Sequence, residues 1–280
     1  MSGTLYVVAT PIGNLEDLTS RARQVLAEVD LVAAEDTRHT GRLLSTIGAK
    51  PALLALHDHN EDQACGTVID ALRGGKDVAL VSDAGTPLIS DPGYRLVRAA
   101  HADNVRVVPI PGASAMTAAL SAAGLATDRF CFEGFPPAKR AARRKWLAAL
   151  AAEQRTIVFY ESVHRIADCL ADMVEVFGAD REAFMGRELT KLHEQCVQAS
   201  LGDLQSRVAD GAIPVKGEFV LAVAGTVADE APAVDVDRLL TLLGESLGPK
   251  DASRIAAELT GQKKNALYDR ILELKRQRDR

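Results

Sequence analysis

The sequence has few cysteines and few aromatic residues. Four cysteines occur among 280 residues, at 65, 131, 169 and 196, and aromatic residues make up 4% of the chain. No two cysteines form a Cys-x-x-Cys pair, and their wide spacing excludes both a disulfide framework and a cysteine-based metal centre. We therefore expect free thiols, no bound metal and a cytoplasmic protein.

The sequence also lacks a convincing targeting or membrane segment. Residues 1–5 carry no basic residue ahead of the first apolar run, which is not typical of a secretory signal. Residues 107–127 carry no charge and are long enough to span a bilayer, but Pro109, Pro111 and Gly112 interrupt them. This stretch is better interpreted as a buried strand, a turn and a core helix.

An excess of positive charge is absent from the chain as a whole. Lys and Arg total 33 against 38 Asp and Glu, for a net charge of −5, so any contact with nucleic acid must be local. The tail from Pro249 holds nine basic and five acidic residues, a net +4, which leaves −9 for the rest. This asymmetry suits a chain with one end that approaches a polyanion.

The N-terminal half alternates short β-branched runs with amphipathic stretches, which predicts an α/β fold with a mostly parallel sheet. The expected strands are 5–9, 31–34, 52–56, 78–81 and 105–108, and the expected helices are 15–29, 40–47, 61–73, 92–100 and 113–123. The first α/β domain should occupy residues 1–126.

After the Phe-Pro-Pro sequence at 135–137 the pattern changes and predicts a second α/β domain, residues 127–226, with a mixed sheet. Its expected strands are 156–160, 184–189, 195–201 and 219–224. Residues 226–235 are rich in Ala, Pro and acidic residues and are expected to be a linker. Beyond it, short helices at 239–243, 251–259 and 265–275 predict a small basic helical module, residues 236–280.

Three expected loops at the carboxyl ends of the first-domain strands combine Gly with Pro, and ligands of open parallel sheets bind at this edge. Glycine lets a backbone approach a ligand closely, whereas proline fixes φ. The alternative is that these residues only form tight turns. Neither a dinucleotide fingerprint nor a P-loop is present. The loops are 10–14, 83–93 and 111–115.

Together with Glu35-Asp36-Thr37-Arg38 and Tyr160-Glu161-Ser162-Val163-His164-Arg165, these loops resemble the tetrapyrrole-methylase superfamily. Within it they are similar to the ribosomal RNA small-subunit methyltransferase I branch. The resemblance runs from about Leu5 to Gly225 and continues into the tail at 261–265. The first loop, Pro11-Ile12-Gly13-Asn14, departs from the Gly-rich, Asp-containing loop of the corrin and porphyrin methylases, which favours the RNA branch.

The resemblance implies transfer of a methyl group from S-adenosylmethionine to the 2′-hydroxyl of a cytidine in 16S ribosomal RNA, with the small ribosomal subunit as partner. It also implies a homodimer and a cofactor held in the cleft between the two α/β domains. The residues expected to bind the cofactor are Pro11, Ile12, Gly13, Asp83, Ala84, Gly85, Thr86, Ser114, Ala115 and Tyr160.

A ribose hydroxyl is a poor nucleophile, so a base or polarising group near it would help. The candidates for this catalytic role are Glu35, Asp36, Glu188 and Lys191, with His57 and Asp91 as further candidates. Each has a structural alternative: Asp36 as a helix N-cap, Glu188 with Lys191 as a surface ion pair, and His57 in a solvated loop.

Two basic segments are candidates for RNA contact. Arg143, Arg144 and Lys145 lie beside Trp146, and Lys263 and Lys264 lie in the tail. A solvated helix face is the alternative for the first group. Two other functions stay open: a small-molecule methylase of the tetrapyrrole type, and a catalytically silent RNA-binding assembly factor on the same fold.

Overall fold

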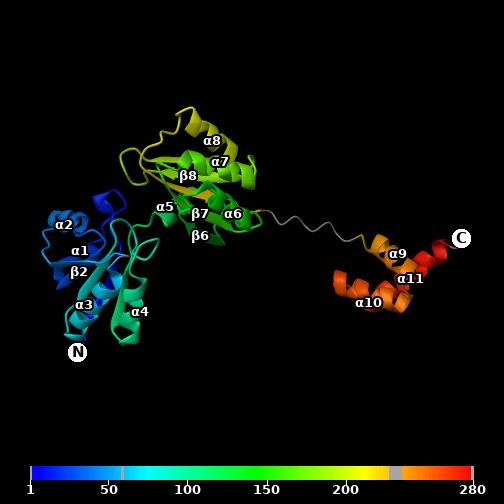
Figure 1. Cartoon of the computed structure of the whole chain (residues 1–280), viewed down its shortest axis with the longest axis horizontal. Helices are drawn as coiled ribbons and strands as arrows, with labels where there is room; N and C mark the ends of the chain where they lie inside the picture. The colour runs from blue at the N-terminus through cyan, green and yellow to red at the C-terminus, as the bar shows by residue number, and fades with distance from the viewer. Residues whose placement is uncertain (1, 58–59, 227–234, 279–280) are drawn as a thin grey trace. The chain divides into compact units, whose positions relative to one another are not determined.

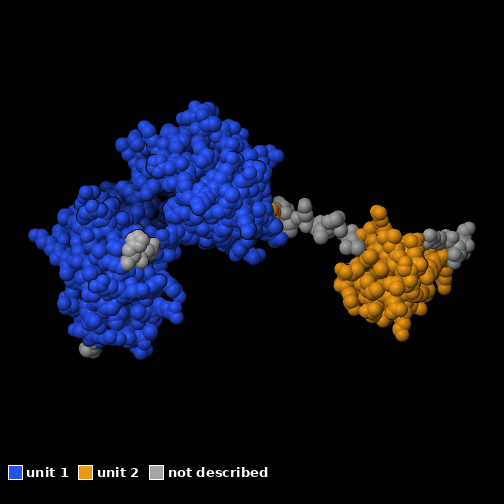
Figure 2. All heavy atoms as spheres, viewed as in Figure 1, with its two compact units in different colours: residues 1–225 blue, residues 226–280 orange. Residues whose placement is uncertain are grey.

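A computed structural model describes residues 2–57, 60–226 and 235–278. The chain divides into two compact units, unit 1 at residues 1–225 and unit 2 at residues 226–280 (Figure 2). Both predicted α/β domains fall within unit 1. The boundary at 126 between them stays a prediction.

The first sheet of unit 1 is built from five parallel strands in the order β3-β2-β4-β1-β5, as the alternating pattern predicted. The strands are β1 (Thr4–Val8), β2 (Leu31–Ala34), β3 (Ala52–Ala55), β4 (Val78–Val81) and β5 (Arg106–Ile110). The helices that accompany them are α1 (Ser20–Glu28), α2 (Thr37–Thr46), α3 (Glu61–Arg73) and α4 (Tyr94–Ala102) (Figure 1).

Successive residues of a strand point to opposite faces, and β4 shows how this builds a three-layer arrangement. Val78 and Leu80 pack into a cluster with α3 and α4, whereas Ala79 and Val81 pack into another cluster with α1 and α2. Both faces of β4 are therefore apolar, and all four of its residues are buried.

The predicted helix at 15–29 is interrupted. Residues Leu15–Asp17 form a short 3-10 helix, and α1 begins at Ser20. Thr19 starts the new helix because its hydroxyl accepts a hydrogen bond from the backbone N–H of Ala22 at 3.1 Å.

The second sheet has the order β6-β7-β10-β8-β9 and is mixed, as predicted, because β6 and β7 are parallel and the other neighbours are antiparallel. Its strands are β6 (Phe130–Gly134), β7 (Thr156–Ser162), β8 (Glu182–Arg187), β9 (Gln195–Ser200) and β10 (Glu218–Val223). The nearby helices are α5 (Ala115–Ala122), α6 (Arg140–Leu150), α7 (Ile166–Phe177) and α8 (Leu201–Ala209). The sequence analysis did not predict β6 or α7.

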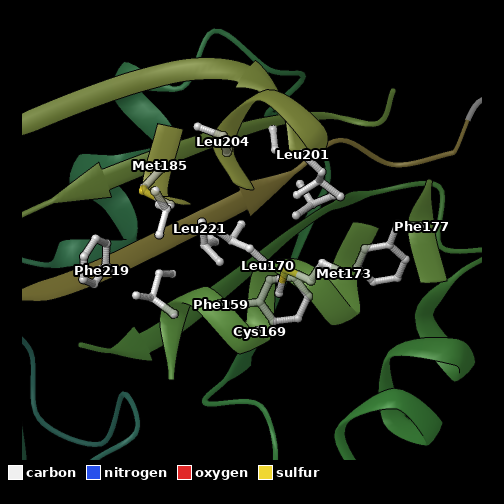
Figure 3. Packing of buried hydrophobic residues seen from close by; sticks show 14 of the residues in the cluster. Phe159, Cys169, Leu170, Met173, Phe177, Met185, Leu201, Leu204, Phe219 and Leu221 are labelled. Carbon is white, nitrogen blue, oxygen red and sulfur yellow. The ribbon is translucent and has the colours of Figure 1, made fainter. Parts of the chain in front are cut away.

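The two faces of the second sheet have different partners. One face places Phe159 and Phe219 against the α6, α7 and α8 side chains, in the cluster that Figure 3 shows. The other face places Val158 and Val220 against α5 and against Ile12 of the first loop. The loop after β1 is thereby packed onto the second sheet, and this contact positions the site.

Unit 2 is a small helical module, as the sequence predicted. It contains α9 (Val236–Ser246), α10 (Pro249–Thr260) and α11 (Lys264–Arg278), packed around Leu240, Ala252, Ala256, Leu267 and Ile271. Most of the predicted linker, 227–234, lies outside the described residues. None of the helices that the structure describes is long and apolar enough to cross a membrane.

Candidate functional site

The loops that follow β1 and β4 are tied together at the carboxyl edge of the first sheet. Thr10 and Gly85 exchange two backbone hydrogen bonds, of 2.8 and 3.0 Å between N and O. Gly85 has a φ of +86°, a conformation that suits glycine. The two Gly-Pro loops therefore form one continuous wall.

A cavity of about 360 Å³ opens beside this wall, and we call it the loop cavity. Eight of the ten residues predicted to bind the cofactor line it, whereas Pro11 and Gly13 lie in a neighbouring cavity. Its lining comprises Ile12, Glu35, Asp83, Ala84, Gly85, Thr86, Ile89, Ser90, Asp91, Ser114, Ala115, Phe135, Tyr160, Glu161, Ser162, Glu218, Phe219 and Val220. The second sheet thus closes a cavity that the first-sheet loops begin.

The loop at 83–93 holds a strained backbone where it borders the loop cavity. Leu88 and Ser90 are not glycines, yet their φ values are +73° and +68°. Such residues cost stability and gather at functional sites. Gly134, which ends β6, approaches this loop so closely that an added Cβ would lie 3.2 Å from the Ser90 hydroxyl oxygen.

One side of the loop cavity is acidic because Glu35, Asp83 and Asp91 all line it. The pKa of Asp91 is raised to about 6, mainly by burial; the nearby charges of Glu35 and Asp83 also raise it, and a hydrogen bond from Ser82 lowers it. Asp83 is oriented by the backbone N–H of Asp36, which donates to its Oδ1 at 3.0 Å. This wall suits a ligand with positive charge.

The lining of the loop cavity also includes the aromatic side chains of Phe135 and Tyr160. The Tyr160 hydroxyl accepts a hydrogen bond from the backbone N–H of Met116 at 3.1 Å, which joins β7 to the start of α5. Its ring meets Phe132 and Phe135 edge-on, with centroid distances of 4.8 and 5.7 Å. Burial raises the pKa of Tyr160.

A second cavity of about 370 Å³ lies along α2, and we call it the α2 cavity. It shares Ile12, Asp83, Ala84 and Glu218 with the loop cavity. The other lining residues are Thr10, Pro11, Gly13, Leu15, His39, Arg42, Leu43, Thr46 and Lys191.

Lys191 joins the β8–β9 loop to this second cavity. Its ammonium donates to Glu188 at 2.8 Å and to Glu218 at 2.6 Å, and its carbon chain packs on Gly13, where a Cβ would overlap it. Burial lowers the pKa of Lys191, but these two carboxylates outweigh burial and raise it overall. The loop is strained, with φ of +50° at Glu188 and +67° at Thr190.

The predicted catalytic residues separate into two groups. Glu35 and Asp91 line the loop cavity and Lys191 lines the α2 cavity. Asp36 and Glu188 line neither: Asp36 caps α2 and pairs with Arg38, whose guanidinium lowers its pKa, and Glu188 forms the ion pair with Lys191. Both residues thus have the contacts of their structural alternatives, and their catalytic role stays a prediction.

His57 also lines neither cavity, and its expected loop neighbours at 58–59 lie outside the described residues. Among the described residues, no cluster of three or more His, Cys, Asp or Glu side chains is placed to hold a metal ion. The described cysteines are free thiols.

The basic segment on α6 differs from the prediction. Arg143 is 2% exposed and pairs with the buried Asp172 of α7, with Nη2 and Oδ2 2.7 Å apart, so its predicted role in RNA contact is wrong. Arg144 forms an ion pair with Glu175. Lys145 remains exposed, as do Lys263, just before α11, and Lys264, the first residue of α11.

Several lining residues escaped the sequence analysis. Glu218 reaches both cavities from the start of β10, and Phe135 lies just beyond β6, the strand that was not predicted. His39 and Arg42 lie on α2 at a spacing of three residues, which places them on one face of the helix. That spacing was the available signal.

Two family models match the chain. The family of tetrapyrrole (corrin/porphyrin) methylases matches residues 4–205, and the "RsmI C-terminal HTH domain" matches residues 230–275. The first match covers most of unit 1, and the second covers most of unit 2.

Curated relatives resemble the chain over nearly its whole length. A protein of Escherichia coli O157:H7 is 54% identical over 273 residues, 97% of this chain and 95% of its own. A protein of Pseudomonas aeruginosa is 52% identical over 275 residues, 97% and 98% of the two chains. Both carry the name ribosomal RNA small subunit methyltransferase I.

Solved structures show the same fold at low identity. The methyltransferase CobJ superposes with a TM-score of 0.59 at 20% identity, over 80% of this chain and 95% of its own. A uroporphyrin-III C-methyltransferase from Thermus thermophilus, complexed with S-adenosyl homocysteine, gives 0.56 at 20% identity over 79% and 97%. The chain therefore belongs to the tetrapyrrole methylase family, and within it to the ribosomal RNA small subunit methyltransferase I group.

Proposed function

We propose that the protein transfers a methyl group from S-adenosylmethionine to the 2′-hydroxyl of a cytidine in 16S ribosomal RNA of the small subunit. The observation that carries this proposal is the match to relatives of that name, at 52–54% identity over 97% of the chain. The choice of the 2′-hydroxyl of a cytidine rests on the resemblance of the sequence motifs.

The loop cavity fits the cofactor by its chemistry. Glu35, Asp83 and Asp91 give it an acidic wall, which suits the ammonium and sulfonium charges of S-adenosylmethionine. Gly85 lets the backbone approach a ligand, and Phe135 and Tyr160 offer aromatic surface for a purine. When bound, the cofactor supplies an electrophilic methyl group on sulfur.

The reaction breaks one C–S bond, forms one C–O bond and releases the hydroxyl proton. Asp83 is placed to accept that proton because it lines both cavities. Glu218 lines both cavities as well, but its carboxylate already accepts a hydrogen bond from Lys191 at 2.6 Å. The remaining contribution is alignment of donor and acceptor, which can supply about 7–11 kcal/mol of a barrier. The rigid loops at 10–14 and 83–93 serve this alignment.

The basic tail supports RNA contact from unit 2. Lys263 and Lys264 are exposed at the start of α11, where they could neutralise phosphates. Lys145 remains a candidate on unit 1. A homodimer in the cytoplasm is proposed from the family resemblance, and light scattering of the purified protein tests the dimer.

One experiment tests the function. Small subunits from cells that lack this modification are incubated with the protein and methyl-labelled S-adenosylmethionine, and the labelled nucleotide is mapped by mass spectrometry. Label on the ribose of one cytidine is expected. Label on a base would contradict 2′-O-methylation, and cofactor binding without any transfer to RNA would favour a silent assembly factor.

A further inference from the structure

The α2 cavity has the size of a ligand site and is separate from the cavity assigned to the cofactor. Its volume of about 370 Å³ falls within the range of about 300–1,000 Å³ for small-molecule pockets. Yet it shares four lining residues with the loop cavity. A ligand in each cavity would touch the same wall from its two sides.

One face of α2 supplies much of the lining. His39, Arg42, Leu43 and Thr46 follow the spacing i, i+3, i+4 and i+7, so they form one stripe along the helix. Leu43 is nearly buried, at 8% exposure, and packs in the core of the first sheet. The other three are polar and face away from that core, and packing alone does not require them.

Arg42 is the cation of this cavity that has no partner among the described residues. In the part of the chain that the structure describes, no hydrogen bond or ion pair involves its guanidinium. Lys191, by contrast, is held by the carboxylates of Glu188 and Glu218. An arginine fork recognises a phosphate through two parallel hydrogen bonds, so the free charge at Arg42 favours an anionic ligand.

The rest of the lining is mainly apolar. Leu15 is 51% exposed at the mouth, and Pro11, Ile12 and Leu43 continue this surface inward. Such a surface accepts the face of a base, while Asp83 at the shared wall is a hydrogen-bond acceptor for a hydroxyl. Protein groups that can bind a phosphate, a base and a hydroxyl therefore surround one cavity.

We infer that the α2 cavity receives the target nucleotide of the RNA, with Arg42 on its phosphate, the Leu15 side against its base and its ribose at the wall shared with the loop cavity. This inference rests on the proposed function. A nucleotide enters such a cavity only after it leaves its stack, which costs least in a single-stranded or distorted segment. The substrate segment is therefore unpaired at the moment of reaction.

Arg42→Ala tests the phosphate contact, with small subunits as the probe. We expect the KM for subunits to rise about tenfold or more, the value for a lost charge-assisted hydrogen bond, and the salt dependence of log KM to lose about one unit of slope. The Kd for S-adenosylmethionine, measured by calorimetry, should stay unchanged. Arg42→Lys should recover part of the loss.

Arg98→Ala is the matched control. Arg98 is an exposed helical arginine of α4 that lines neither cavity and has no ion pair among the described residues. The control should keep the wild-type KM and slope. If Arg42→Ala matches this control, the phosphate contact is refuted; if it instead loses cofactor binding, the assignment of the two cavities is reversed.

A filling variant gives an independent test. Thr46→Trp places a ring in the α2 cavity from its exposed end, so methylation of subunits should fall at least tenfold while cofactor affinity holds. Ser45→Trp places the same ring on an exposed residue of α2 that lines neither cavity, and it should be near wild type. Unchanged methylation by Thr46→Trp would overturn the inference. Wild-type protein that binds cofactor but never methylates subunits would instead refute the proposed function.

Discussion

The buried ion pair between α6 and α7 makes a quantitative prediction about stability. Asp172 is fully buried, and its two oxygens accept hydrogen bonds from Arg143 at 2.7 Å and Arg140 at 3.0 Å. Asp172→Asn keeps the shape of the side chain but removes its charge. The guanidinium of Arg143, itself 3% exposed, is then left buried without a counter-charge.

Removal of one partner from a buried pair costs about 3–5 kcal/mol of unfolding free energy. Arg140 adds nothing to this figure, because its side chain is 67% exposed and solvent screens its charge. For a unit of this size, each kcal/mol lowers Tm by about 2–4 °C, so the transition of unit 1 should fall by roughly 6–20 °C.

Urea unfolding followed by tryptophan fluorescence measures this change, because the single tryptophan, Trp146, lies on α6 and packs edge-on against Phe159. Arg144→Ala is the control, since its pair with Glu175 is partly exposed and should contribute about 0–1 kcal/mol. An apolar replacement of both partners, Arg143→Met with Asp172→Leu, should restore most of the stability.

The result that would refute this reasoning is specific. Suppose that Asp172→Asn unfolds within about 1 kcal/mol of the wild type. Suppose further that Arg143→Ala raises the KM for small subunits at an unchanged unfolding midpoint. Arg143 would then contact RNA, and its burial in the pair would not describe its working state.

Three further predictions concern the site and the tail. Gly13→Ala should displace Lys191 and lower kcat/KM about tenfold. The addition of Lys191→Ala should relieve the overlap, so the unfolding midpoint of the double variant should match that of Lys191→Ala alone. Burial raises the pKa of Asp91 to about 6, so its ionised form destabilises the fold, and the stability that this group contributes is lost as pH rises from about 4 through 6. In urea titrations, the unfolding free energy of Asp91→Asn should therefore rise relative to that of the wild type over this interval, and the difference should stay constant at higher pH. Deletion of 236–280 should raise the KM for subunits and flatten its salt slope at unchanged cofactor affinity, whereas an unchanged KM would make unit 2 a structural appendage.

The packing of unit 2 determines where this deletion must begin. A cut at 249, where the basic tail begins, would leave α9 without the α10 and α11 residues that pack on Leu240. The exposed apolar face would then cause effects unrelated to RNA. Removal of the whole helical module avoids this, because unit 1 keeps its own core.

Much of the fold could be predicted from periodicity. Buried β4 reads as an uninterrupted apolar run, and the alternation of such runs with amphipathic helices fixed the parallel sheet. The mixed second sheet was harder, because β6 carries a register shift after Phe132 and its first residue is exposed. A strand that is half exposed and irregular leaves little pattern to detect.

The candidate site could be predicted only where the local sequence has a distinctive composition. Glycine and proline mark the loops at 10–14 and 83–93, and three of these residues, Pro11, Gly13 and Gly85, line the cavities. A charged residue carries no such mark: Arg42 and Arg143 are both helical arginines in the sequence. One faces a cavity without a partner and the other is buried against Asp172, and only tertiary packing distinguishes them.

Backbone strain gives a final argument about where this molecule does its chemistry. Among the residues that the structure describes, five non-glycine residues have positive φ, and four of them, Leu88, Ser90, Glu188 and Thr190, lie in the two loops that border the cavities. Each such residue costs on the order of 1–3 kcal/mol of stability. Substitution to glycine or asparagine would remove much of this cost in a loop that has no other function. These two loops also carry the residues of the site: the β8–β9 loop brings Lys191 onto Gly13 and Glu218, and the loop after β4 carries Asp83 and Asp91, which both line the loop cavity. Glycine or asparagine at Ser90 or Thr190 accepts the same positive φ, so either substitution should relieve strain and leave the backbone that borders the two cavities in place.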